Sequence, residues 1–227
     1  RQLPLGSNGS PGVSMQHLEF GHSEFIARAD RTLWHKKSGT LFLSDLHLGK
    51  GAHFRQAGIP IPEASELSDL DRLIRAIKNT QAKTVWVLGD LFHQPQSISS
   101  AQMDRWQHVL DPLHVELNVI LGNHDRQAES FAYALGFLIK PEPTLWCGIE
   151  LAHHPHDDSA YRIAGHIHPQ VEFKAASDRL TYPCFAIKHH RLLLLPAFTM
   201  FSGGPRFQPK DAHCFAIVND DVLPPTN

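Results

Sequence analysis

The chain has 227 residues, of which 42% are hydrophobic and 19% are charged, and its formal net charge at pH 7 is −2. This length and composition indicate one folded domain and exclude a disordered tail. The balanced charge excludes a global basic field that would draw the whole chain to nucleic acid.

The ends of the chain and its cysteines indicate a soluble protein of a reducing compartment, which we expect to be cytoplasmic. No stretch reaches the roughly 18 apolar residues of a membrane span, and residues 1–14 lack the apolar core of a signal peptide. Cys147, Cys184 and Cys214 stand far apart, which argues against a disulfide framework and against a cysteine-type zinc site. We expect residues 1–14 to be an added or disordered leader and residues 15–227 to form a single domain.

The predicted elements change character along the chain. In order, we expect strands at 18–20, 24–29 and 40–44, a helix at 63–79, a strand at 84–88, a helix at 99–111 that opens with a capping box, a strand at 115–121 and a helix at 127–135. Strands follow at 144–152, 161–164, 182–187, 192–195 and 213–218. Strand–helix units followed by a mostly β half fit one α/β domain of two packed sheets with helices outside.

The 17 histidines are the unusual feature of the composition, because histidine is the commonest metal ligand and titrates near neutral pH. Five predicted strands run directly into such a side chain or into an oxygen donor. Since ligands of open α/β sheets gather outside the carboxyl ends of the strands, we expect these five ends to converge on one site. They carry Asp45-Leu46-His47, Asp90, Asn123-His124-Asp125, His153 and His166-Ile167-His168.

The local sequence around these donors predicts how they are presented. A glycine stands directly before Asp90, Asn123 and His166, where it lets the backbone bend sharply and brings polar groups close together. We expect Asp45 and His47 to lie on one side of an extended segment, because alternate residues of a strand share a face. The His166-x-His168 pair predicts the same geometry.

The donor types indicate which metals this site would hold. Two aspartates, one amide and four imidazoles without a thiolate suit Mn, Fe or Zn, of which we expect Mn, and they suit Ca poorly. Seven or more donors are too many for one four-coordinate ion. They fit two divalent ions about 3.5–4 Å apart that share a bridging carboxylate.

Together these motifs resemble the full motif series of the calcineurin-like metallophosphoesterases. The resemblance implies a four-layer α/β-β/α sandwich of two mixed sheets flanked by helices. It places a first metal among Asp45, His47, Asp90 and His168, and a second among Asp90, Asn123, His153 and His166, with Asp90 as the bridge. His124 would stand beside the scissile phosphate and protonate the leaving oxygen.

A finer resemblance is to the bacterial ligase-associated DNA-damage-response endonuclease branch. It is carried by motifs such as Ser44–Lys50, Gly89–His93 and the Leu195-Pro-Ala-Phe198 run, and it implies a functional link to a DNA ligase and a helicase. Where many phosphatases have an aspartate three residues after the bridging one, this chain has His93. That form is similar to SbcD-type repair nucleases, in which the histidine assists at the phosphate. Asp125 or a backbone group would then orient His124.

These observations predict a phosphodiesterase or nuclease linked to DNA repair, in which a hydroxide shared by two metals is the nucleophile and His124 is the general acid. Lys50, Arg55 and Arg126 are candidate contacts for substrate phosphates, with ordinary surface charge as an even alternative. His153 is favoured over His154 as a ligand because it follows the strand directly.

Several alternatives stay open. A deep closed pocket would favour a small-molecule phosphatase or a cyclic-nucleotide phosphodiesterase, whereas an open groove with basic side chains along it would favour DNA. A non-catalytic scaffold with the same fold would be expected to lose ligands or the acid, and this chain keeps all of them. The length and an open second sheet permit a homodimer without requiring one.

Overall fold

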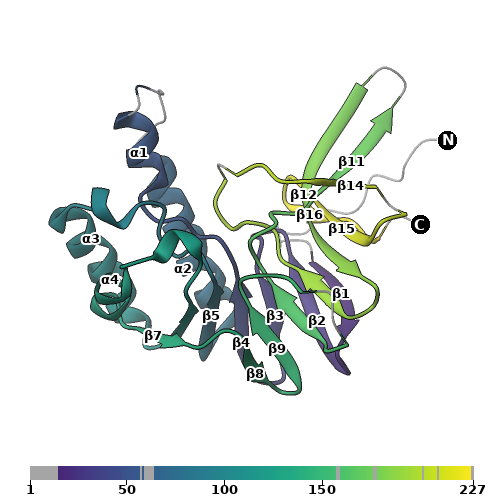
Figure 1. Ribbon diagram of the computed structural model, residues 1–227, viewed down its shortest axis with the longest axis horizontal. Coiled ribbons are helices and arrows are strands. Elements are labelled where there is room, and N and C mark those ends of the chain that lie inside the picture. The colour runs from purple at the N-terminus through teal and green to yellow at the C-terminus, as the bar shows by residue number, and fades with distance from the viewer. Residues whose placement is uncertain are drawn as a thin grey trace.

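The computed structural model describes residues 15–56, 58, 64–156, 159–175, 178–200, 202–208 and 210–225. Two mixed β-sheets pack face to face, and helices cover the outer face of the first sheet (Figure 1). The α/β class and the two mixed sheets predicted from the sequence are confirmed. The leader predicted at residues 1–14 lies outside the described residues.

The first sheet has seven strands in the order β1-β2-β3-β4-β5-β6-β7. Its antiparallel part consists of β1 (Met15–Phe20), β2 (Ser23–Arg28), β3 (Leu33–His35) and β4 (Thr40–Leu43). Its parallel part continues from β4 through β5 (Thr84–Leu88), β6 (Glu116–Ile120) and β7 (Phe137–Lys140). The carboxyl ends of β4, β5 and β6 therefore meet at one edge of this sheet.

Helices connect the parallel strands and cover one face of the first sheet. They are α1 (Lys50–Gln56), α2 (Ala64–Thr80), α3 (Ser100–Leu110) and α4 (Glu129–Ala134), joined by short 3-10 turns at Pro95–Ser97, Asp111–Leu113 and Asn123–Asp125. The predicted capping box of α3 is confirmed, because the Ser99 hydroxyl accepts from the backbone N–H of Gln102 and the Gln102 side chain accepts from the N–H of Ser99.

The second sheet has nine strands, and its parallel centre is β9-β10-β13. The strands along its main path are β14 (Arg206–Phe207), β11 (Gln170–Ala175), β12 (Asp178–Lys188), β13 (Leu192–Leu194), β10 (Arg162–Ala164), β9 (Ile149–Ala152) and β8 (Thr144–Trp146). Beside them, β15 (His213–Val218) pairs with β12 and with β16 (Asp221–Val222). The β11–β12 hairpin extends away from the body of the molecule (Figure 1).

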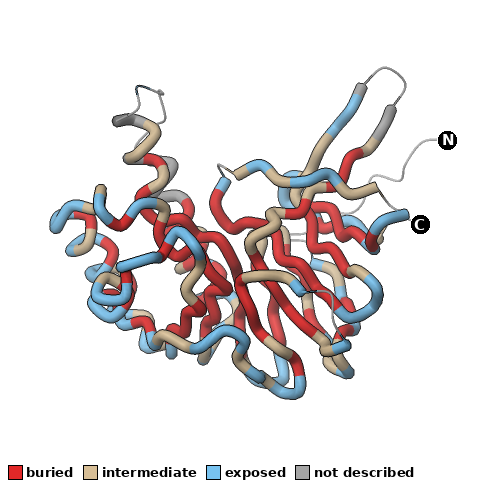
Figure 2. Tube along the Cα trace, viewed as in Figure 1, coloured by how far each residue is buried: buried red, intermediate tan, exposed pale blue. Residues whose placement is uncertain are grey.

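Alternation along the strands divides the core into layers. Leu41, Leu43 and Val85 face the helices, whereas Phe42 and Trp86 face the second sheet. Phe42 is fully buried, and burying such a side chain contributes about 1.5–3 kcal/mol. Figure 2 shows these buried strands at the centre of the molecule. This packing fixes the strand ends that carry the predicted donors.

The structure differs from the predicted elements in three places. The stretch predicted as one strand at 144–152 is a hairpin, because Cys147 and Gly148 turn the chain with φ of 48° and 81°. Helix α1 and the strands β3, β7, β11, β14 and β16 were not predicted. Among the described residues after Ala134 there is no helix, so the helical layer expected outside the second sheet has no counterpart there.

Candidate metal centre

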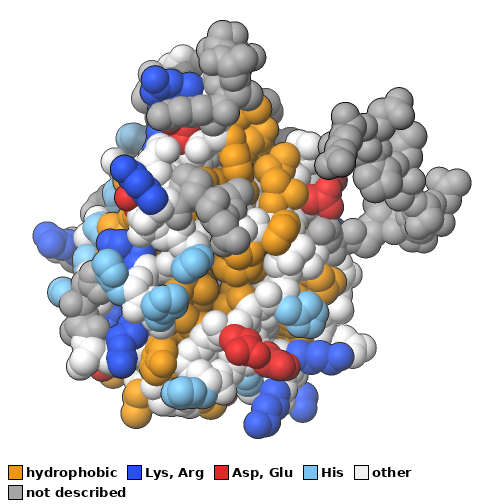
Figure 3. All heavy atoms as spheres, turned by 90° about the vertical axis from the view of Figure 1, so that its right-hand side faces the viewer, with side chains coloured by type: hydrophobic (Ala, Val, Ile, Leu, Met, Phe, Trp, Pro, Cys, Tyr) orange, Lys and Arg blue, Asp and Glu red, His pale blue; other side chains and the backbone are white. Residues whose placement is uncertain are grey.

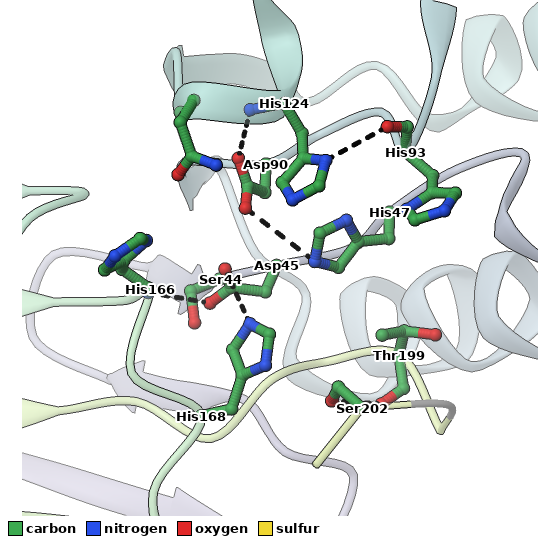
Figure 4. Close-up of polar contacts among 12 residues, drawn as sticks. Ser44, Asp45, His47, Asp90, His93, His124, His166, His168, Thr199 and Ser202 are labelled. Carbon is green, nitrogen blue, oxygen red and sulfur yellow. Dashed lines mark hydrogen bonds and ion pairs between the residues drawn. The ribbon is translucent and has the colours of Figure 1, made fainter. Parts of the chain in front are cut away.

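The predicted donors meet where the carboxyl ends of the two sheets come together (Figure 4). A backbone bridge pairs Ser44, just after β4, with Ala197, which follows β13 of the other sheet. The backbone N–H of His166 donates to Asp45 Oδ2 at 3.1 Å across the same junction. The convergence predicted from five strand ends is therefore present.

One group of donors surrounds Asp45. Its Oδ1 lies 3.1 Å from Nε2 of His168, and one donor atom each of Asp45, His47 and His168 lie within 4.8 Å of one another. The ring of His47 points at the next strand end, with Nε2 3.8 Å from Oδ2 of Asp90. Two imidazole nitrogens and two carboxylate oxygens are thus gathered in a set that could hold one divalent ion.

A second group lies on the other side of Asp90. Nε2 of His153 is 3.7 Å from Asp90 Oδ1 and 3.1 Å from Asn123 Oδ1. The same nitrogen lies 3.0 Å from Nδ1 of His166. The two oxygens of Asp90 therefore face different groups, which is the placement that a bridging carboxylate needs.

The polar atoms of the first group indicate that it suits a cation. Asp45 Oδ1, His47 Nε2 and His168 Nε2 are buried and have no assigned hydrogen bond among the described residues, although Asp45 Oδ1 and His168 Nε2 face each other at 3.1 Å as an ion pair. Buried polar atoms without partners are costly unless a ligand satisfies them. A divalent ion fits this requirement.

The charge states of His47 and Asp45 suit metal binding, which needs neutral imidazole and ionised carboxylate. Burial works to lower the pKa of the His168 ring, but contact with Asp45 raises it above its usual range. Burial, reinforced by Lys50, lowers the pKa of the His47 ring to about 2. Burial works to raise the pKa of the Asp45 carboxyl, but contact with His168 and the fields of His153 and His47 bring it below its usual range. At neutral pH, His47 and Asp45 therefore keep their lone pairs available.

The backbone presents several donors in the left-handed region and not in extended segments. Asp45 and His47 have φ of 55° and 49°, and His166 and His168 have φ of 67° and 52°. The expectation that each pair alternates on an extended strand is therefore wrong. Asp45 and His47 still point into one region, whereas His166 points to the second donor group and His168 to the first. Left-handed conformations cost non-glycine residues about 1–2 kcal/mol each, and such strain concentrates at functional sites.

The glycines before the donors act mainly through close approach. A Cβ on Gly89, whose φ is +86°, would lie 1.8 Å from Nδ1 of His153. A Cβ on Gly122 would lie 2.2 Å from Oδ1 of Asp90, and one on Gly165 would lie 2.6 Å from the carbonyl oxygen of Leu88. Of these three glycines, only Gly89 has a positive φ. The predicted sharp bend is therefore found at Gly89 alone, whereas the predicted close approach of polar groups is found at all three.

His124 is exposed beside Asp90, whose Oδ1 accepts from its backbone N–H at 3.0 Å. Its Nδ1 lies 3.2 Å from the carbonyl oxygen of His93, and the two rings stack with centroids 5.5 Å apart. Asp125 is turned away, because its carboxylate accepts from the backbone N–H groups of Leu91, Phe92 and Gly122. The sequence predicted that Asp125 or a backbone group orients His124. In the structure, the backbone carbonyl of His93 is the group that contacts the His124 ring.

The expected basic side chains fall in different environments. Lys50 begins α1 and borders a small cavity with His47 and Thr199, and burial lowers its pKa. Arg126 is exposed just after the Asn123–Asp125 turn. Arg55 lies in α1, but its side chain is outside the part that the structure describes.

The structure also shows two contacts that the sequence did not predict. The carbonyl of Gly203 lies 3.2 Å from Nδ1 of His168. Glu142, far from the other donors in sequence, contacts His154 at 3.2 Å. The Gly203-Gly204 pair belongs to the finer family resemblance, but its contact through the backbone was not predicted, and Glu142 stands alone in a loop without a motif.

A further group outside the predicted set supports the strap of residues 197–200, which runs past Asp45 (Figure 4). Arg31 donates to the carbonyls of Ala197 and Thr199, and Arg72 donates to that of Phe198. Arg72 also lies 3.0 Å from Oδ1 of Asp69. The sequence analysis singled out residues 195–198 only through the family resemblance. It did not predict that Arg31 and Arg72 support this segment.

A small cavity borders the first donor group at His47. The cavity bordered by His47 and Lys50 has a volume of about 10 Å³, which is too small for a nucleotide-sized ligand. A cavity of about 740 Å³ lies between β1 and the second sheet and is lined by none of the predicted donors. The face on that side carries scattered histidines and hydrophobic side chains (Figure 3). The site is therefore identified by the geometry of its donors and not by the volume of a cavity.

Comparisons with known proteins agree with this geometry. The family model described as calcineurin-like phosphoesterase matches residues 40–167. Among 34 matching chains of solved structures is the Pseudomonas putida nuclease MPE, with 25% sequence identity, a TM-score of 0.79, and coverage of 93% of this chain and 100% of that chain. The search of curated proteins gave no match. No helix in the described part of the chain is long and apolar enough to cross a membrane.

Proposed function

The chain belongs to the calcineurin-like phosphoesterase family, and from that premise we propose that it is a two-metal phosphodiesterase that cuts nucleic acid. A hydrolase of phosphoric esters follows from the family. The preference for diesters, the nucleic-acid substrate and the link to DNA repair are our proposal.

The observation that supports this proposal best is the position of Asp90. Its two carboxylate oxygens face two separate donor groups, at 3.8 Å from His47 and 3.7 Å from His153. We assign Asp45, His47 and His168 with Asp90 to a first metal, and Asn123, His153 and His166 with Asp90 to a second. Two divalent ions, for which Mn is our choice and Fe or Zn are alternatives, would neutralise the phosphate and make water a stronger nucleophile.

The chain's own residues would bind and protonate the substrate. The carbonyl of His93 accepts from Nδ1 of His124, so the imidazolium form of His124 would give its Nε2 proton to the leaving oxygen and keep the Nδ1 hydrogen. His93 stacks on that ring and limits how far it can turn. Burial, reinforced by Lys50, lowers the pKa of His93 to about 4, so His93 acts at the phosphate as a neutral hydrogen-bonding group.

Three further features support a polymeric substrate. The cavity next to Lys50 is only about 10 Å³, whereas Asn123, His124 and Arg126 are exposed at the surface. Exposed side chains beside the buried donors leave room for a long chain, while small-molecule sites usually bury most of the ligand. A solved structure that aligns over nearly the whole chain is called a nuclease. The DNA-repair role, with its link to a ligase and a helicase, rests on the resemblance in sequence.

The test compares substrates under one set of conditions. Purified protein with added Mn is given bis(p-nitrophenyl) phosphate, p-nitrophenyl phosphate, plasmid DNA and single-stranded DNA, with Asp90→Asn as the control. We expect the diester and at least one DNA to be cleaved and the variant to be inactive. If the wild type cleaves only the monoester, the diester proposal is wrong. If Asp90→Asn keeps full activity, the two-metal assignment is wrong.

A further inference from the structure

A third imidazole, that of His154, stands beside the two of the second donor group without belonging to the set assigned above. One donor nitrogen each of His153, His154 and His166 lie within 4.8 Å of one another. The ring centroid of His154 is 4.7 Å from that of His153 and 4.9 Å from that of His166. A loop position alone does not account for the closeness of the His154 ring to the rings of His153 and His166.

Glu142 holds His154 in this position from the connection between β7 and β8. Its Oε1 accepts from the backbone N–H of His154 at 2.6 Å, and its Oε2 lies 3.2 Å from Nδ1 of the ring. One carboxylate thus holds both the backbone N–H and the ring of His154.

This pairing decides which ring nitrogen is available. An ionised carboxylate can only accept, so Nδ1 of His154 carries the hydrogen and Nε2 keeps its lone pair. Metal-binding histidines are commonly fixed in this way, with a carboxylate behind the ring nitrogen that does not bind the metal. A surface histidine that binds no metal does not require a carboxylate that contacts both its backbone N–H and its ring.

The distances are close to those of a shared ion. Nitrogens on opposite sides of one ion with bonds of about 2.1 Å stand about 4.2 Å apart, and one nitrogen from each of the three rings already lies within 4.8 Å of one nitrogen of the other two. The His154 side chain is 43% exposed, so core packing does not prevent its ring from closing the remaining gap.

We propose that His154, presented by Glu142, is an additional ligand of the second metal position; this rests on the two-metal function proposed above. The second position would then have three imidazoles and the first only two. Because added nitrogen donors favour Zn and Co over Mn, the second position would bind Zn or Co more tightly than the first.

The test measures metal binding and not turnover. Metal-free full-length protein is titrated with Co²⁺, with visible absorption and calorimetry as readouts. The variants are His154→Ala and Glu142→Gln, and the matched control is His156→Ala, which removes an exposed histidine two residues further along. We expect two binding steps in the wild type, and a weakening of the tighter step by about 10-fold or more in both variants. The control should match the wild type.

The possible results separate the two proposals. If His154→Ala binds two Co²⁺ with wild-type affinities and an unchanged spectrum, His154 is a surface residue and this inference is overturned, while the two-metal function stands. If the wild type itself binds no second Co²⁺, both fail together. Should His154→Ala not fold, Glu142→Gln answers the same question, because it leaves the ring in place and removes the charge that orients it.

Discussion

Gly89→Ala tests whether the tight approach beneath His153 is what positions the second donor group. The new Cβ would lie 1.8 Å from Nδ1 of His153 and 2.2 Å from its Cγ, where ordinary contacts begin at 3.4 Å. The ring would therefore have to withdraw by about 1.6 Å, whereas metal–ligand distances tolerate about 0.2 Å. We expect the variant to lose the second metal.

The expected loss of stability has two parts. Gly89 has φ of +86°, which costs a side-chain-bearing residue about 1–2 kcal/mol. Forcing the new methyl group against a fully buried ring adds about 1–3 kcal/mol. We therefore expect urea unfolding of the metal-free variant to show a loss of about 2–5 kcal/mol.

The matched control is Gly148→Ala. Gly148 has φ of +81°, and nothing lies within 4 Å of the position that a Cβ would take there, so alanine carries the backbone cost without the clash. It should lose only about 1–2 kcal/mol and keep both metals. If Gly89→Ala binds two metals as the wild type does and is no less stable than Gly148→Ala, the placement of His153 described above is wrong.

Three further predictions follow from the same contacts. His124→Ala should keep both metals while diester turnover falls by about 10²–10⁴-fold; loss of metal instead would make His124 a ligand. Because the folded pKa of His93 is about 4, below its unfolded value of 6.5, the unfolded chain binds more protons in this range and stability falls as pH drops from 6.5 toward 4. His93→Gln should flatten that part of the urea-unfolding profile of the metal-free protein, and an unchanged profile would contradict the shift. Arg72→Met should lower the free energy of unfolding by about 3 kcal/mol, because it removes the ion-pair partner of the buried Asp69 carboxylate. The double variant with Asp69→Asn should recover part of that loss, and a simple sum of the two single effects would show that the pair is not coupled.

The sequence predicted the strand ends well because apolar runs and donors are both local signals. Thr84–Leu88 and Asp90, for example, stand next to each other in the chain and in the site. The long amphipathic helix α2 and the capping box at Ser99 were equally local. The donors converged as expected because neighbouring parallel strands bring their carboxyl ends to one edge.

The sequence failed where long-range contacts decide the conformation. The left-handed backbone at Asp45 and His47 is held by hydrogen bonds from their N–H groups to the carbonyls of Gly89 and Asp90. The Glu142–His154 contact joins residues 12 positions apart that have no shared pattern. The strand predicted over 144–152 failed for a local reason, because the Cys147-Gly148 turn was overlooked.

A crystal structure of the protein grown with Mn²⁺, with anomalous scattering recorded at the Mn edge, would test the two-metal assignment without relying on activity. We expect two peaks about 3.5–4 Å apart, one beside Asp45, His47 and His168 and the other beside Asn123, His153 and His166, with Asp90 between them. A single peak, or two peaks that do not share Asp90, would contradict the assignment.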